Sequence, residues 1–77
     1  VQLNKNILCK PHKDVFNKGE SIIFGLGSYF NGGELIIENE PHDIKRRVLV
    51  FDGSKNLHWV NNWEYGDRYT VTCYNIV

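Results

Sequence analysis

Short apolar runs separated by turn residues organise this chain. Three of them cover residues 21–27, 34–38 and 47–51. In the second run, Leu35 and Ile37 would share one face of a strand and Ile36 would lie on the other. The third run is continuously apolar and ends at Asp52-Gly53, a dipeptide that is a strong turn signal. Each run therefore predicts a β-strand.

The cleanest alternation lies at the C-terminal end of the chain. Over residues 68–77, Arg68 and Thr70 fall on one face of a predicted strand, opposite Tyr69 and Val71. A weaker strand is expected within residues 1–9. An apolar period of 3.6 residues does not persist for two turns anywhere, so no helix is expected. Several short strands with turns between them predict an all-β sandwich or barrel.

Composition narrows the class of protein. Seventy-seven residues allow one domain, over residues 1–77. Nine basic and nine acidic residues leave no net charge, which argues against a strongly electrostatic nucleic-acid binder. No apolar run is long enough to cross a membrane. Cys9 and Cys73 are too few for a disulfide scaffold, so a reducing, cytoplasmic location is expected.

The candidate chemistry begins with His12 and Asp14. Residues two apart in an extended segment point to the same side, so these two side chains could converge on one point. His58 follows the Asp52-Gly53 turn. Two histidines and one carboxylate form the facial triad that binds non-haem Fe(II) and leaves coordination positions open.

Arg68 adds a second feature, ten residues beyond His58. A buried guanidinium is costly unless it meets an anion, and its planar fork suits a carboxylate. With Thr70 beside it, Arg68 could hold the distal carboxylate of a dicarboxylic acid. The alternative is an exposed Arg68 paired with Asp67 or Glu64.

Taken in order, these motifs resemble the iron(II)/2-oxoglutarate-dependent dioxygenase superfamily, above all its compact viral and microbial members. The matching segments are residues 12–19, 25–29, 32–35, 51–53, 58 and 66–70. The resemblance extends over residues 4–76. It implies a double-stranded β-helix, which is a jelly-roll or cupin-like barrel. Only about eleven residues precede His12 and the chain has no Met, so a minimal or N-terminally truncated core is expected.

The resemblance also implies the roles of the residues. His12, Asp14 and His58 would be the catalytic Fe(II) ligands, while Arg68 and Thr70 would bind 2-oxoglutarate. The enzyme would be a hydroxylase that couples oxidative decarboxylation of 2-oxoglutarate by O₂ to hydroxylation of a C–H bond. Family members reach the cosubstrate from an early strand as well, for which the candidates are Ser21, Ile23 and Tyr29.

The sequence does not identify the primary substrate. A protein side chain such as prolyl is the first expectation, with a nucleobase or a small molecule as alternatives. A non-catalytic β-barrel that binds a metal or ligand is the alternative function, and Arg68 with Thr70 argues against it. His42 is expected in an exposed turn, outside the metal site, and Trp59 and Trp63 are expected to pack under the mouth of the barrel.

Overall fold

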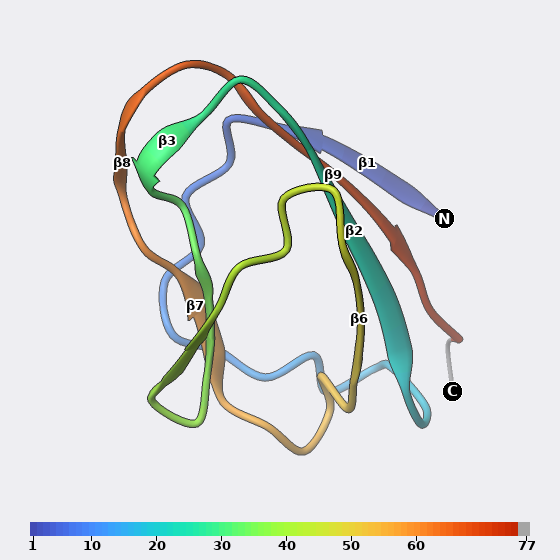
Figure 1. Cartoon of the computed structure of the whole chain (residues 1–77). Helices are drawn as coiled ribbons and strands as arrows, with labels where there is room; N and C mark the ends of the chain where they lie inside the picture. The colour runs from blue at the N-terminus through green and yellow to red at the C-terminus, as the bar shows by residue number, and fades with distance from the viewer. Residues whose placement is uncertain (76–77) are drawn as a thin grey trace.

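Nine short strands, most of them connected by tight turns, make up the part of the fold that the structure describes (Figure 1). The computed structural model describes residues 1–75, and within them no helix forms. The strands are β1 (Gln2–Lys5), β2 (Ser21–Gly27), β3 (Phe30–Gly32), β4 (Leu35–Ile37), β5 (Glu40–His42), β6 (Val48–Phe51), β7 (His58–Val60), β8 (Trp63–Tyr65) and β9 (Arg68–Cys73). The expected all-β class is therefore confirmed. None of these described residues builds a helix long and apolar enough to span a bilayer.

The strands form three antiparallel sheets. The largest has the order β1-β9-β2-β6, a second has the order β5-β4-β7, and β3 pairs with β8. β2 and β9 form the longest pairing, from Ile22 opposite Cys73 to Gly27 opposite Arg68. Strands distant in sequence thus lie side by side in the largest sheet, and β9 lies at its centre with β2.

The predicted strands appear close to their expected places. The run expected over 68–77 is a strand as far as Cys73, and its last two residues lie outside the described part of the chain. The expectation for His42 was wrong, because it lies in β5. Glu38 and Asn39 both have positive φ, 47° and 69°, and form a two-residue hairpin loop between β4 and β5. Three-residue strands of this kind are too short to produce a readable periodicity.

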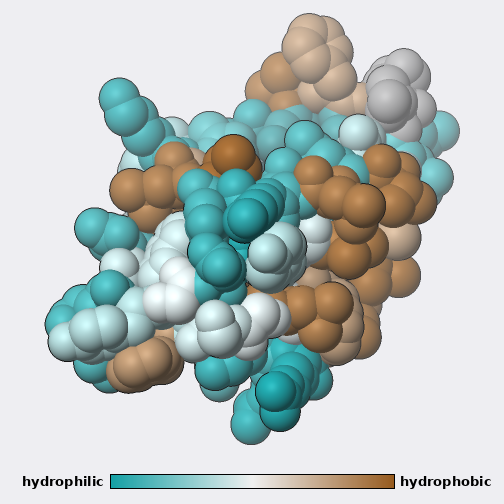
Figure 2. All heavy atoms as spheres, turned by 90° about the horizontal axis from the view of Figure 1, so that it is seen from above, coloured by the Kyte–Doolittle hydropathy of each residue, from teal (hydrophilic) through white to brown (hydrophobic). Residues whose placement is uncertain are grey.

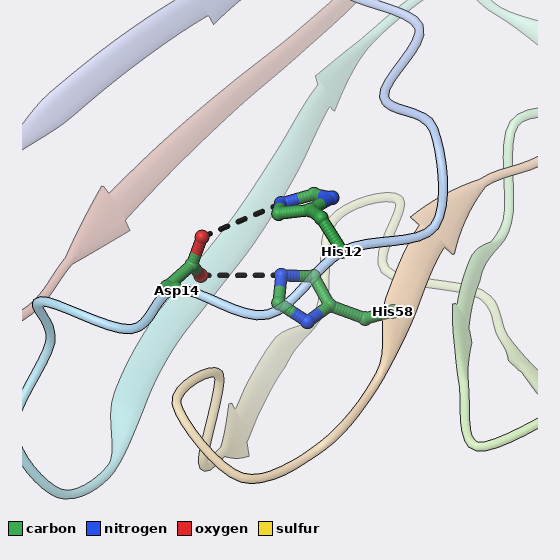
Figure 3. Close-up of side chains that lie close together, drawn as sticks. All are labelled: His12, Asp14 and His58. Carbon is green, nitrogen blue, oxygen red and sulfur yellow. Dashed lines mark ion pairs between the residues drawn. The ribbon is translucent and has the colours of Figure 1, made fainter.

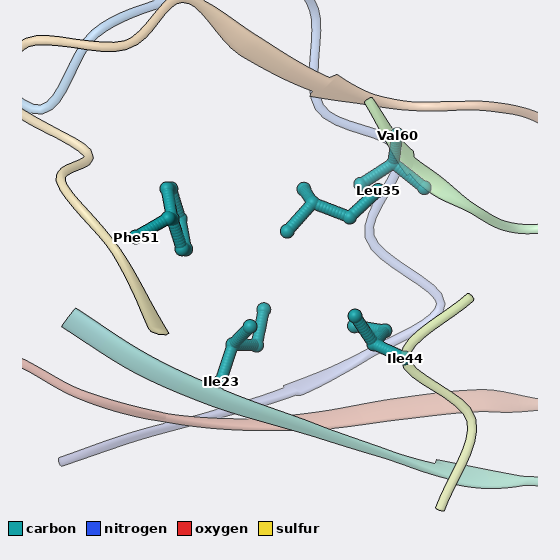
Figure 4. Packing of buried hydrophobic residues seen from close by; sticks show 5 residues of the cluster. All are labelled: Ile23, Leu35, Ile44, Phe51 and Val60. Carbon is teal, nitrogen blue, oxygen red and sulfur yellow. The ribbon is translucent and has the colours of Figure 1, made fainter. Parts of the chain in front are cut away.

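The hydrophobic core lies between the largest sheet and the three-stranded sheet. Figure 4 shows Ile23 of β2 facing Leu35 of β4, with Phe51, Val60 and Ile44 around them. All five side chains are at most 9% exposed. A core of five residues is small, in keeping with the small share of surface that a chain of this length can bury.

Candidate metal centre

Backbone pairing brings together the two histidines that lie far apart in sequence. The His12 N–H donates to the His58 carbonyl and the His58 N–H donates to the His12 carbonyl, both at 3.0 Å. Residues that exchange both hydrogen bonds in an antiparallel bridge lie directly opposite each other. The turn after β6 leads the chain back toward His12. In this turn the Asp52 carboxylate accepts hydrogen bonds from Ser54 and Lys55.

The Asp14 carboxylate lies beside the two imidazole rings and faces one nitrogen of each (Figure 3). Its Oδ1 is 3.3 Å from His12 Nε2 and its Oδ2 is 3.2 Å from His58 Nε2. The two ring centroids are 4.4 Å apart. Each of the three side chains offers one possible ligand atom, and these three atoms lie within 4.8 Å of one another. The three residues singled out in the sequence therefore converge on a single point.

Hydrogen bonds on the far side of each ring determine which nitrogen can bind a metal. His12 Nδ1 lies 2.6 Å from the Lys10 carbonyl, and His58 Nδ1 lies 2.8 Å from the Asn56 carbonyl. A carbonyl oxygen only accepts, so Nδ1 is the donor in each contact, and the neutral form of each ring would then have its lone pair on Nε2. Metal-binding histidines are held by the same kind of second hydrogen bond. Two such nitrogens and one carboxylate suit Fe(II).

The cluster is buried on one side and open on the other. The His58 side chain is 6% exposed and packs edge-on against Phe51, with ring centroids 5.0 Å apart. The His12 and Asp14 side chains are 39% and 34% exposed. A facial triad needs this arrangement, because three protein ligands occupy one side of the metal and leave the other side for substrates.

Arg68 is almost entirely buried at the start of β9. Its residue exposure is 4%, and its Nε donates to the Gly33 carbonyl at 2.9 Å. Its guanidinium carbon lies 5.5 Å from the Tyr29 ring centroid and 5.9 Å from that of Trp63. Burial lowers the pKa of Arg68 below its ordinary value. Arg68 is therefore not the exposed, paired residue of the alternative interpretation.

One nitrogen of this guanidinium lacks a protein partner. Among residues 1–75, the buried side-chain atoms without a hydrogen-bond partner are Arg68 Nη2, Tyr29 Oη and Ser21 Oγ. Burial raises the pKa of Tyr29, and the nearby Arg68 charge offsets part of that shift. A buried donor of this kind is unfavourable without an acceptor, so Arg68 Nη2 is available to a ligand that carries an acceptor group.

One cavity of about 120 Å³ connects the histidine cluster with Arg68. Cavities of this order can hold a benzene-sized molecule. The cavity has polar groups at the histidine cluster and at Arg68, with apolar side chains between them. It would suit a short molecule with an anionic end. The lining includes His12, Asp14, His58, Arg68, Thr70, Ile23, Leu35, Phe51, Trp59 and Val60. Of the early-strand candidates, Ile23 thus lines the cavity, whereas Tyr29 packs on the guanidinium.

Comparison with known proteins gives one structural match. No protein-family model and no curated protein matches the sequence. The solved structure of NgTET1 in complex with 5mC DNA superposes with a TM-score of 0.81 at 25% sequence identity. The superposition covers 96% of this chain and 32% of that chain. The present chain therefore spans about a third of the length of NgTET1, and nearly all of it has a structural counterpart there.

Several polar residues of the cavity were not identified from the sequence. Thr72 lines it from β9, and Gln2 and Asn4 line it from β1. The register pairs Gln2 with Thr72 and Asn4 with Thr70, so all of them share the inner face of the sheet. The alternation of β9 could have identified Thr72, because it lies two residues beyond Thr70. Cys9 also lines the cavity, and burial raises the pKa of its thiol.

Gly53 is expected to position Asp14 for metal binding. Its carbonyl accepts the Asp14 N–H at 2.8 Å, and its φ lies outside the left-handed region. A Cβ there would lie 2.6 Å from Asp14 Oδ2 and 3.4 Å from His58 Cε1. Position 53 therefore requires a glycine because a larger side chain would collide with the Asp14 carboxylate, and not because of the backbone conformation. We expect Gly53→Ala to weaken metal binding about 10–100-fold, as changes to groups that orient ligands do.

Titration with Fe(II) under anaerobic conditions, with circular dichroism of the metal-free protein, tests this role of Gly53. Lys55→Ala, an exposed change in the same turn, is the matched control. Unchanged metal affinity in Gly53→Ala would contradict the positioning role. A loss of folding without metal would instead assign the glycine to the fold.

Replacing Arg68 by methionine is expected to stabilise the protein. The substitution removes a desolvated cation and its unpartnered Nη2, and keeps much of the side-chain volume. A gain of about 1 kcal/mol would raise the melting temperature by roughly 4–8 °C in a domain of this size. Thermal denaturation measures this change in melting temperature, and the exposed Arg47→Met is the control. A lower melting temperature for Arg68→Met would show that the hydrogen bond to Gly33 outweighs the cost of burying the charge.

Proposed function

We propose that this chain is the core domain, over residues 1–77, of an Fe(II)- and 2-oxoglutarate-dependent dioxygenase with a double-stranded β-helix fold. The observation that carries the proposal is one cavity whose lining includes a His-Asp-His cluster and Arg68, whose Nη2 has no hydrogen-bond partner. The similarity to NgTET1, which is an Fe(II)- and 2-oxoglutarate-dependent enzyme, supports it.

In this proposal the chain contributes ligands and orientation. His12 Nε2, His58 Nε2 and the Asp14 carboxylate would hold Fe(II). The Arg68 guanidinium, with the Thr70 hydroxyl beside it, would bind the distal carboxylate of 2-oxoglutarate. When bound, Fe(II) and 2-oxoglutarate supply the activation of O₂ and the oxidative decarboxylation that drive C–H hydroxylation. Holding the cosubstrate at both ends converts an encounter between several reactants into a reaction within one complex.

Residues from the early strands would complete the cosubstrate site. Ile23 lines the cavity and would contact the carbon chain of 2-oxoglutarate. Tyr29 is 3% exposed and packs on the guanidinium, so it would restrict the orientation of Arg68. Gly33 makes this packing feasible, since a Cβ at that position would lie 2.6 Å from Tyr29 Cδ2.

The comparison changes the order of the candidate substrates. NgTET1 was solved with 5mC DNA, which favours a methylated base in DNA as the first substrate to test. A protein side chain such as prolyl and a small molecule come next. The support for DNA is the comparison alone, because the zero net charge of the chain provides no basic surface overall. A cytoplasmic location is also proposed, and the free thiols of Cys9 and Cys73 support it.

Anaerobic titration with Fe(II) and 2-oxoglutarate tests the proposed cofactor chemistry. We expect a weak visible charge-transfer band that needs both components and disappears in His58→Ala. The matched control is His42→Ala, because among the described residues His42 is not part of the cluster. A folded protein that binds Fe(II) but develops no band with 2-oxoglutarate would favour a non-catalytic metal-binding barrel.

A further inference from the structure

Asn6 lies just after the end of β1, next to the start of β9. The ladder between these two strands ends at Lys5 opposite Tyr69, so the next pair in register is Asn6 with Arg68. In Figure 1 the ends of β1 and β2 meet the start of β9 at the upper end of the largest sheet. Figure 2 views the molecule from above, and hydrophilic and near-neutral residues, in teal and white, occupy the middle of that view. Both Asn6 and Asp67 are exposed.

Three hydrogen bonds connect Asn6 to the residues that open β9. The Asn6 N–H donates to the Arg68 carbonyl, and the Arg68 N–H donates to Asn6 Oδ1, both at 2.7 Å. Asn6 Nδ2 also donates to Asp67 Oδ1 at 2.9 Å. A hydrogen-bonded pair in an antiparallel ladder normally exchanges two backbone hydrogen bonds. Here the side-chain oxygen of Asn6 takes the place of its backbone carbonyl, so the ladder continues by one pair after the backbone of β1 has left it.

The backbone of Asn6 turns the chain out of the sheet. Its φ is 53°, in the left-handed region that asparagine enters more readily than most other residues with a side chain. After this turn the chain continues into the segment that carries His12 and Asp14. Asparagine therefore combines two properties at position 6, because it tolerates the turn and its amide supplies both an acceptor and a donor.

Arg68 depends on such contacts because it is the first residue of its strand. The ends of secondary-structure elements open more readily than their middles. The side chain of Arg68 donates to the Gly33 carbonyl and packs on Tyr29, but its backbone follows directly on the turn at Gly66 and Asp67. A shift of this backbone would move the whole guanidinium relative to the histidine cluster in the same cavity.

We propose that Asn6 is a positioning residue that holds Arg68 where its guanidinium can bind the distal carboxylate of 2-oxoglutarate. This inference rests on the proposed function and names a residue that acts through Arg68. The side chain of Asn6 bonds to residues 67 and 68 and contributes no ligand to the metal cluster. If Arg68 were in place only a tenth of the time, the apparent affinity for 2-oxoglutarate would fall about 10-fold. The affinity for Fe(II) would not change.

Asn6→Gly tests this role, because glycine keeps the left-handed backbone and removes the amide. We expect anaerobic titration to show an affinity for 2-oxoglutarate about 10-fold weaker than in the wild-type protein, with Fe(II) affinity unchanged. The matched control is Asn39→Gly, at an exposed asparagine with a φ of 69° in the loop between β4 and β5, which should bind both ligands normally. Full 2-oxoglutarate affinity in Asn6→Gly, or a parallel loss of Fe(II) affinity, would overturn the inference.

Exchanging the two side chains provides a rescue. In the double variant Asn6→Asp with Asp67→Asn, the amide donates to the carboxylate in the opposite direction and the net charge stays the same. The Arg68 N–H still meets a side-chain oxygen at position 6. We expect this variant to bind 2-oxoglutarate as the wild-type protein does. Binding as weak as in Asn6→Gly would contradict the role of these hydrogen bonds.

A measurement without ligands separates this inference from the proposed function. The Arg68 Nε–H donates to the Gly33 carbonyl, so its hydrogen exchange in the metal-free protein, followed by NMR, reports how firmly the side chain is held. We expect slow exchange in the wild-type protein and in Asn39→Gly, and faster exchange in Asn6→Gly. Equal exchange in all three would overturn the positioning role. A wild-type protein that binds Fe(II) but not 2-oxoglutarate would instead refute the proposed function, and the cosubstrate role of Asn6 with it.

Discussion

Asp14→Ala is expected to abolish Fe(II) binding in the micromolar range. The substitution removes the anionic ligand and the group that lies within 3.3 Å of both histidine Nε2 atoms. Changes to groups that merely orient ligands cost about 10–100-fold in affinity, so the loss of a ligand should exceed 100-fold. His12→Ala should have a similar effect, because the triad has no spare ligand. Anaerobic titration of metal-free protein with Fe(II) measures both variants.

Controls for Asp14→Ala separate ligand loss from a loss of fold. His42→Ala removes a histidine outside the cluster and should bind Fe(II) as the wild-type protein does. Asp14→Asn keeps the size of the side chain but removes its charge, and should also bind poorly. Unchanged titration in both Asp14→Ala and His12→Ala would refute the triad.

Arg68→Ala should leave metal binding intact yet weaken 2-oxoglutarate binding by about 2–5 kcal/mol, which is the usual cost of removing one partner of a desolvated charge pair. That range corresponds to at least about 30-fold in affinity. The reason is that Arg68 Nη2 is a buried, unpartnered donor of a residue that lines the same cavity as the triad. Titration of the Fe(II)-loaded protein with 2-oxoglutarate measures this difference.

The control for Arg68→Ala is Arg47→Ala, which removes an exposed guanidinium and should not change the affinity for 2-oxoglutarate. Arg68→Lys distinguishes charge from geometry. Lysine keeps the charge but not the planar fork, so its affinity should lie between those of Arg68→Ala and wild type. Equal cosubstrate affinity in Arg68→Ala and wild type would exclude the proposed anchor.

The two proposals can fail separately. If Asp14→Ala loses the metal while Arg68→Ala keeps full cosubstrate affinity, the chain binds a metal without the proposed cosubstrate site. That result would favour a metal-binding barrel without oxygenase chemistry. If both variants behave as expected, assay on 5mC DNA becomes the next step, because a methylated base in DNA is the first substrate to test under the proposed function.

Features that depend on local geometry could be predicted from the sequence. The strands β2, β4, β6 and β9 lie within predicted runs, because turn residues and alternation are visible over a few residues. The relation between His12 and Asp14 is also local, since residues two apart share a side of an extended chain. The same rule placed Arg68 and Thr70 on one face of β9. Both point inward, at 4% exposure each.

Only the tertiary structure decided which distant residues meet. His58 reaches His12 through a pair of backbone hydrogen bonds between segments that no short-range pattern connects. Gln2 and Asn4 line the cavity because β1 pairs with β9, and Gly53 lies beside Asp14 because the turn after β6 packs there. The direction in which β9 faces is also a tertiary property. Alternation divides a strand into two faces, but packing against the rest of the chain determines which of them is buried.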